Sequence, residues 1–191
     1  MLRFLENHDE DRAAFALGNR HRAMAVLLAM LPGLRLYQDG QFDGRHIRLP
    51  VQLGVRPQEP VDHALHDFYR ELFAIGREPV LRYGEYRPLY VAESWEHNHT
   101  AMFIVTAWRS YQGEYLMAAV NIGHVQAQAY TEIPAEALGA DVVEFQDLLS
   151  NAEYYRSTSH LKSFGLYLDM PPGGYHLFRV RPADEGCQAE Y

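Results

Sequence analysis

The sequence predicts an α/β segment followed by an all-β antiparallel sandwich. In the first 76 residues, short apolar runs alternate with longer amphipathic segments, as in parallel strands joined by helical crossovers. After Gly76 the apolar period changes to two, in short segments that are rich in β-branched and aromatic residues and are separated by turn sequences. We therefore expect two domains, residues 1–78 and residues 79–191.

The first three expected elements are a strand, a helix and a second strand. Residues 2–5 form a short apolar run that stops at polar residues 6–9, as a buried parallel strand does where it ends. Across residues 11–31, apolar side chains recur three or four positions apart, which predicts one helix of about 18 to 20 residues. A Pro-Gly pair ends this helix, and residues 34–37 form the second predicted strand.

A polar loop and a second helix complete the α/β segment. Glycine and proline recur through residues 38–60, which argues against a regular element, and loops of this kind often carry function. Asp62 is a suitable N-cap for a helix that runs through Ile75 with one apolar stripe.

The second part contains a series of candidate strands with alternating polarity. They are residues 87–92, 101–108, 114–122, 126–133, 142–147, 165–170 and 174–180. Residues 110–113 have the chemistry of a hairpin turn, and the Pro-Pro-Gly-Gly sequence at residues 171–174 forces a turn before the last strand. Short strands at this spacing are typical of a β-sandwich.

Composition and charge exclude several classes of function. With 48% apolar and 22% charged residues, the chain has enough material for a packed core. A net charge of −8 repels a phosphate backbone, so we expect no nucleic-acid partner. The longest apolar run, residues 23–34, is too short and too broken to span a membrane. The acidic N-terminal sequence lacks the features of a signal peptide, so we expect a cytoplasmic protein. The single Cys187 excludes an intramolecular disulfide framework but leaves the redox compartment open. We expect no cofactor.

Polar residues 6–9, Glu-Asn-His-Asp, are the sharpest candidate site. They follow the first predicted strand, and barrel enzymes gather catalytic groups at the C-terminal ends of their strands. The alternative is an ordinary polar loop in which Asp9 caps the following helix. These four residues alone leave both interpretations open.

Several strings along the chain occur in the order and at the spacing of one known family. They are FLENHD (residues 4–9), MLPG (30–33), LRLYQDGQ (34–41), RLPVQLG (48–54), FYREL (68–72) and LDMPPGGYH (168–176). Together they resemble the last quarter of the α-amylase family, glycoside hydrolase family 13, and the fourth and fifth strings resemble a bacterial subgroup of it. The resemblance implies that the α/β segment is the last two βα units of a TIM-type (β/α)8 barrel and that the second part is a C-terminal Greek-key sandwich.

The resemblance also implies an activity and a set of site residues. Asp9 corresponds to the family's third carboxylate, which stabilises the oxocarbenium-like transition state, and His8 to the histidine that hydrogen-bonds the sugar beside the scissile bond. Asn7 belongs to the same motif, and Arg12 is placed to face the site. The implied reaction is hydrolysis or transglycosylation of α-glucans with retention, and no metal is expected. Asp11 stands where proline is common in the family.

The same resemblance implies that the chain alone is catalytically incomplete. The family's nucleophilic aspartate and general-acid glutamate lie on the fourth and fifth barrel strands, whereas this chain corresponds to the barrel from its seventh strand. Two parallel strands with two helices cannot close a barrel, so we expect an upstream barrel segment, a homo-oligomer or packing on the sandwich to cover them. The alternative is a non-catalytic accessory or carbohydrate-binding module, or the product of an interrupted gene.

Three further clusters have a functional and an ordinary interpretation. Asp39 and Asp43 are either additional carboxylates near Asp9 or turn-forming residues of the loop. A histidine and glutamate group is either a surface metal site or a solvated loop, and comprises Glu93, Glu96, His97 and His99. An aromatic group is either a sugar-stacking platform or part of the core, and comprises Trp95, Trp108, Tyr111 and Tyr115.

Overall fold

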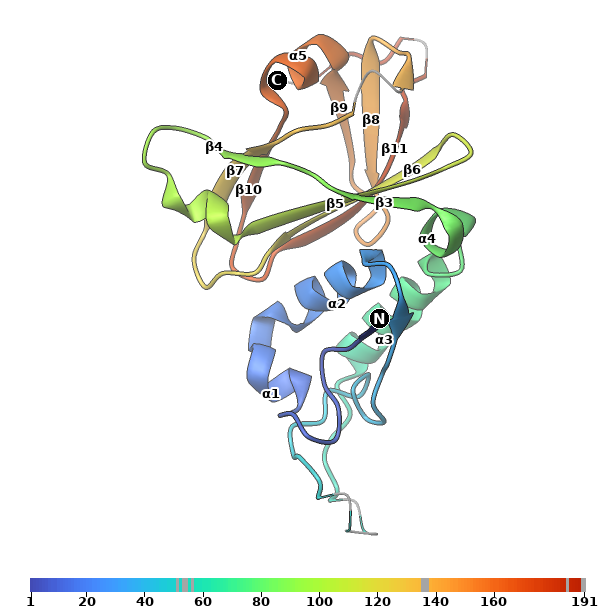
Figure 1. Ribbon diagram of the computed structural model, residues 1–191, viewed down its shortest axis with the longest axis vertical. Helices are drawn as coiled ribbons and strands as arrows, with labels where there is room; N and C mark the ends of the chain where they lie inside the picture. Colours follow the sequence, from blue (N-terminus) through green and yellow to red (C-terminus); the bar gives the residue numbers. More distant parts are fainter. Residues whose placement is uncertain (51, 53–54, 56, 135–137, 185, 190–191) are drawn as a thin grey trace.

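The chain has a mixed α/β fold with antiparallel sheets in this computed structural model, which describes residues 1–50, 52, 55, 57–134, 138–184 and 186–189 (Figure 1). The helices are α1 (Ala13–Leu17), α2 (His21–Met30), α3 (His63–Ile75), α4 (Pro79–Tyr83) and α5 (Thr158–Phe164), with 3-10 turns η1 (Gly18–Arg20) and η2 (His99–Phe103). The strands are β1 (Leu2–Arg3), β2 (Leu34–Arg35), β3 (Glu85–Pro88), β4 (Val91–Glu93), β5 (Ile104–Tyr111), β6 (Glu114–Asn121), β7 (Ala127–Thr131), β8 (Val142–Asp147), β9 (Glu153–Ser157), β10 (Leu166–Met170) and β11 (Tyr175–Pro182).

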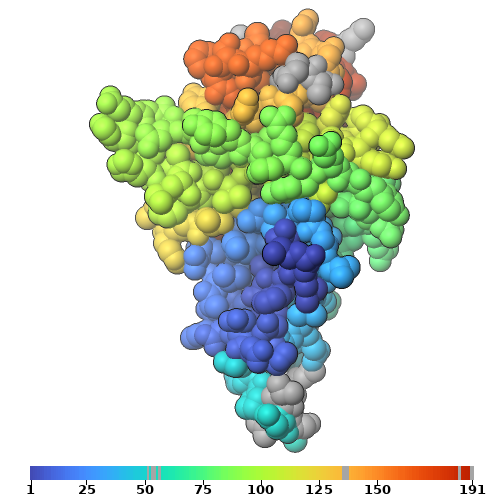
Figure 2. Space-filling view, viewed as in Figure 1, coloured from blue at the N-terminus to red at the C-terminus, as the bar shows by residue number. Residues whose placement is uncertain are grey.

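Strands β1 and β2 form the parallel pair that the sequence predicts. Leu2 lies opposite Leu34, and the backbone N–H of Leu36 donates to the Arg3 carbonyl at 2.9 Å. Each strand is shorter than predicted, because neither has a second neighbouring strand among the described residues. The dark blue N-terminal residues lie at the surface of the molecule in Figure 2, and Leu34 is 74% exposed. This pair of strands is therefore open on its outer side.

The prediction of a single helix over residues 11–31 is wrong, since the segment divides into α1, η1 and α2. Gly18 has φ +54° and ψ −126°, which takes the backbone out of the helical region. The turn that follows packs closely on Gly173, where a Cβ atom would meet the Asn19 carbonyl oxygen at 2.6 Å. A tertiary contact of this kind overrides the helical period.

Helix α3 begins where the sequence predicts. The Asp62 side chain accepts a hydrogen bond from the Leu65 backbone N–H at 2.9 Å and so satisfies one free donor of the first turn. The buried side chains of the helix, which include Phe68, Tyr69 and Leu72, lie on one stripe and face α2 and the sheet.

Two antiparallel sheets form most of the described chain after α4. The larger has the strand order β3-β5-β6-β11-β8-β9 and the smaller the order β10-β7-β4. They enclose one apolar core that includes Trp108, Met117, Phe145 and Phe178. The hairpin predicted at residues 110–113 joins β5 to β6, with Tyr111 opposite Glu114.

The prediction of one continuous strand over residues 87–92 is wrong, because two strands share this segment. Its residues belong to β3 and β4, which lie in different sheets, because Leu89 and Tyr90 carry the chain from one sheet to the other. The sequence also gave no sign of β9, an edge strand whose side chains are only partly buried.

Helices α2 and α3 cover the outer face of the larger sheet, as Figure 1 shows. Small residues of the sheet, Ala107 and Ala118, let α2 approach closely. The Arg109 side chain crosses the junction, and its Nε donates to the Met30 carbonyl at 2.8 Å. The face of α2 is thus covered by the sheet, whereas the outer side of β1 and β2 is not. None of the described helices is long and apolar enough to cross a bilayer.

Candidate functional site

Residues 6–9 lie where β1 ends, and a local turn fixes their shape. The Asn7 Oδ1 accepts hydrogen bonds from the backbone N–H of Asp9 at 2.8 Å and of Glu10 at 3.0 Å. This turn leaves the side chains of His8 and Asp9 62% and 75% exposed, with His8 Nε2 3.3 Å from Asp9 Oδ2. An exposed carboxylate beside an imidazole is therefore presented to solvent at the end of a parallel strand.

A depression of about 400 Å³ opens beside this pair. It is lined by His8, Asp9, Arg48, Pro50 and Gln52. Arg48 belongs to the RLPVQLG string but is not a predicted site residue, because the loop carries no periodic signal that would place it against residues 6–9. Residues 51, 53 and 54 of that string lie outside the described residues. The depression offers a carboxylate, an imidazole and a guanidinium in one place.

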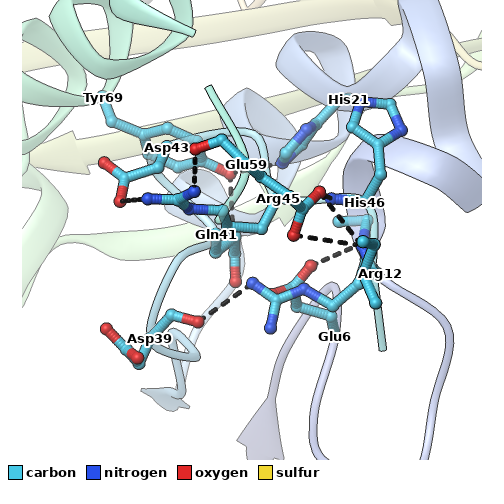
Figure 3. Close-up of polar contacts among 12 residues, drawn as sticks. Glu6, Arg12, His21, Asp39, Gln41, Asp43, Arg45, His46, Glu59 and Tyr69 are labelled. Carbon is cyan, nitrogen blue, oxygen red and sulfur yellow. Dashed lines mark hydrogen bonds and ion pairs between the residues drawn. The ribbon is translucent and has the colours of Figure 1, made fainter. Parts of the chain in front are cut away.

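A buried ion pair between Arg12 and Glu6 holds the loop of residues 6–9 against the protein interior. Arg12 Nη2 lies 2.9 Å from Glu6 Oε1, and the two side chains are 5% and 0% exposed. The same nitrogen donates to the Asp39 carbonyl at 2.9 Å, and Figure 3 shows Arg12 between these two partners. Arg12 is therefore directed into the protein and does not line the depression beside Asp9.

Glu6 also fixes the start of α1. Its Oε2 accepts the backbone N–H of Ala13, the first residue of the helix. Burial raises the pKa of Glu6, although the Ala13 hydrogen bond and the Arg12 charge oppose the rise. The interpretation of Asp9 as the helix cap is wrong, because the cap carboxylate comes from Glu6 and the Asp9 side chain contacts His8.

The following loop is held by its own charged groups. The Glu59 carboxylate accepts the backbone N–H of His46 at 2.7 Å, and Arg45 donates to the Glu59 carbonyl. Asp43 lies 3.6 Å from Arg45 and 3.2 Å from the His66 Nδ1. Asp43 and Asp39 do not line the depression at Asp9, which favours their interpretation as loop-forming residues.

A buried polar network joins α2, α3 and the loop. His21 Nε2 lies 2.9 Å from the Tyr69 hydroxyl, and Gln41 Nε2 donates to the same hydroxyl at 2.8 Å (Figure 3). Burial lowers the pKa of His21 to about 4, and the Arg22 charge adds to this. Burial likewise raises the pKa of Tyr69. Both groups are therefore neutral at pH 7.

This network predicts a pH-dependent stability. The pKa of His21 is about 4 in the folded chain and about 6.5 when unfolded, so between these values the unfolded state binds the proton. We expect the free energy of unfolding to fall by about 2 kcal/mol between pH 7 and pH 5 through this group. Urea unfolding at the two pH values measures it: His21→Gln should remove that part of the fall, whereas His63→Gln, at an exposed histidine, should keep it. An equal fall in all three proteins would contradict the assignment.

The other candidate clusters remain dispersed. His99 Nδ1 lies 3.6 Å from Glu93, and His97 Nε2 lies 3.4 Å from Glu96. The Glu93 side chain is about half exposed, and the other three are largely exposed. In the described part of the chain, no group of three or more such side chains is placed to hold a metal ion. Trp108 is buried in the core against Tyr115, so the four aromatic residues do not form one exposed platform.

Comparisons place the fold among solved enzymes. No protein-family model matches the chain, and no curated protein is similar to it in sequence. The maltogenic α-amylase AmyB from Thermotoga neapolitana matches its structure with a TM-score of 0.69 and 13% identity, over 93% of this chain and 40% of that one. The Geobacillus thermoleovorans α-amylase, solved with acarbose, matches with a TM-score of 0.66 and 15% identity, over 96% and 39%.

A variant of AmyP in complex with maltotriose matches with a TM-score of 0.64 and 14% identity, over 95% of this chain and 41% of that one. The chain thus spans about two fifths of the length of these structures. At these identities the likeness shows a shared fold.

Proposed function

We propose that the chain is the C-terminal part of an α-amylase-family glycosidase or transglycosidase that acts on α-glucans with retention. The observation that carries the proposal is the exposed His8–Asp9 pair at the end of β1, beside a depression, in a fold that α-amylases share over more than nine tenths of the chain. The acarbose and maltotriose in two of these structures support an oligosaccharide as the ligand.

Each residue has a role that its surroundings support. Asp9, exposed and free of a strong cation partner among the described residues, would stabilise the positive charge that develops on the sugar. His8 would donate to a sugar hydroxyl, and Asn7 holds the turn that presents both side chains. Arg12, assigned to the substrate on sequence grounds, is buried, and we propose that it acts by positioning the loop through Glu6.

We further propose that residues 1–78 are the last two βα units of a TIM-type barrel and that residues 79–191 are a Greek-key sandwich. An upstream barrel segment would then cover the open side of β1 and β2, where Leu2, Phe4 and Leu34 are exposed. A groove of about 290 Å³ lies there, between β1 and α2, and is lined largely by leucines. We keep the cytoplasm as the expected location.

The isolated chain is expected to release no sugar from an α-1,4-glucan, because the proposed nucleophile and general acid belong to upstream strands. A reducing-sugar assay measures this, with a complete α-amylase as the positive control and light scattering on the same sample to record its mass. Release that Asp9→Asn abolishes would contradict the proposal, since the chain would then hold a complete catalytic set.

A second candidate function is a non-catalytic accessory or carbohydrate-binding module, or the product of an interrupted gene. The coverage of about two fifths of each matching structure favours it. Binding of an α-glucan without restored activity, in a folded complex with the upstream strands, would support this candidate over the first.

A further inference from the structure

A pocket of about 360 Å³ lies where α2 and α3 begin, apart from the depression at Asp9. Its wall is formed by the start of each helix and by the loop that carries Gly44 and His46. Gly44 lets this loop pass close to α3, since a Cβ atom there would lie 3.1 Å from the Asp62 Cβ. The proposed reaction uses none of the polar side chains of the wall, which are those of Asn19, His21, Arg22, His46 and Asp62.

His21 places a buried hydrogen-bond donor on this wall. His21 is 3% exposed, and its Nε2 lies 2.9 Å from the Tyr69 hydroxyl (Figure 3). Gln41 Nε2 donates to that hydroxyl, so the hydroxyl proton is directed at His21 Nε2. Burial lowers the pKa of His21 to about 4, and the neutral ring then carries its single proton on Nδ1. This Nδ1–H has no acceptor among the described residues, and it is left for a group in the pocket.

Arg22 adds a cation to the same wall. Its guanidinium lies over the Phe68 ring, 5.6 Å from the centroid, and makes no ion pair with any described residue. His46 is exposed, and its charge, like that of Arg22, lowers the pKa of His21, whose largest cause of lowering is burial. Two imidazoles and one unpaired guanidinium therefore meet at the pocket.

The start of α2 has the polarity that an anion favours. This helix has ten residues, with no acidic residue in its first turn and no side-chain cap, so no carboxylate compensates the positive end of its dipole. Helix α3 differs, because the Asp62 Oδ1 accepts the Leu65 N–H, and the positive end of α3 offsets the charge of this carboxylate. Arg22 therefore leaves the pocket with an excess of positive charge.

An oxyanion is the group that these features select. A phosphate or carboxylate oxygen accepts strong hydrogen bonds from a guanidinium and is stabilised near a helix start. It would also supply the acceptor that the buried His21 Nδ1–H lacks. We propose that the pocket binds the phosphate or carboxylate group of a small molecule, held by His21 Nδ1 and Arg22 with His46 beside them. The volume of about 360 Å³ leaves room for the remainder of such a ligand.

Calorimetric titration with inorganic phosphate and with acetate, at pH 7 and constant ionic strength, tests this inference. Arg22→Met keeps an apolar stem on Phe68 but removes the guanidinium, and it should weaken binding about tenfold, as for the loss of a hydrogen bond to a charged group. His46→Gln, at an exposed position, should weaken binding by a smaller factor. Arg70→Met replaces an arginine of α3 outside the pocket and should leave binding unchanged.

Amide and imidazole NMR of the 15N-labelled chain locates the bound anion. The largest shifts should occur at residues 18–22 and at the His21 Nδ1–H. Binding of phosphate without acetate would assign a phosphorylated ligand, and the reverse would assign a carboxylate. No binding of either anion, or binding that both pocket variants leave unchanged, would overturn the inference. His8→Ala alters only the proposed reaction site and should leave binding unchanged, so this result is independent of the proposed function.

Discussion

Under the proposed function, Asp9→Asn should lower kcat about 10²- to 10³-fold once the chain is combined with barrel strands that supply a nucleophile and a general acid. The substitution keeps the size and shape of the side chain and removes the negative charge that would face the developing oxocarbenium ion. The loss should fall on kcat more than on KM, because the interaction strengthens in the transition state. Steady-state hydrolysis of an α-1,4-glucan measures both constants.

Glu10→Gln is the matched control for this substitution. Glu10 is the next residue, is exposed and donates its backbone N–H to the same Asn7 side chain, but it does not line the depression. Its kcat should stay within about twofold of the unmodified value, as for a surface substitution. A loss of equal size in both variants would show that the loop as a whole, rather than the Asp9 carboxylate, carries the effect.

Arg12→Met should destabilise the isolated chain by about 3 to 5 kcal/mol. It leaves the Glu6 carboxylate buried without its cation and removes the donor to the Asp39 carbonyl. Urea unfolding at pH 7 measures the change in the free energy of unfolding. The double variant Glu6→Met, Arg12→Met should recover much of the loss, because no unpaired charge is then buried.

Arg70→Met is the control variant, which measures how much the replacement of an exposed arginine by methionine changes the stability. Arg70 lies 3.2 Å from Asp67 in α3, and both side chains are mostly exposed. Exposed pairs contribute little, so its effect should stay within about 0.5 kcal/mol. A small effect of Arg12→Met, similar to that of Arg70→Met, would contradict the view that the buried pair holds the β1 loop.

The sequence predicts correctly those helices, turns and strands that depend on side chains close together in the chain. The Asp62 cap, the hairpin at residues 110–113 and β8 follow from side chains within a few positions, and each lies where the sequence placed it. The break at Gly18 escaped prediction because it depends on a contact with Gly173, which is remote in the sequence. β9 escaped because an edge strand has no strict alternation of burial.

The sequence predicts the part of the candidate site that lies within one turn of the chain, and it does not predict the residues that remote segments bring there. Residues 7–9 share one turn, so their proximity could be inferred from the chain itself. Arg48 reaches the same depression only through the path of a long loop, which no periodicity records. Arg12 points inward because Glu6 is fully buried beside it. Glu6 lies three residues beyond the two-residue strand β1, and nothing in the local sequence indicates that its carboxylate is buried.

The proposed function can be tested by α-glucan hydrolysis with a combined protein. This chain is joined to, or mixed with, the upstream part of the Geobacillus thermoleovorans α-amylase that it does not cover. We expect no release from either part alone, release from the folded combination, and loss of that release in Asp9→Asn. A folded, equimolar combination that releases no sugar, or an isolated chain that does, would overturn the proposed function.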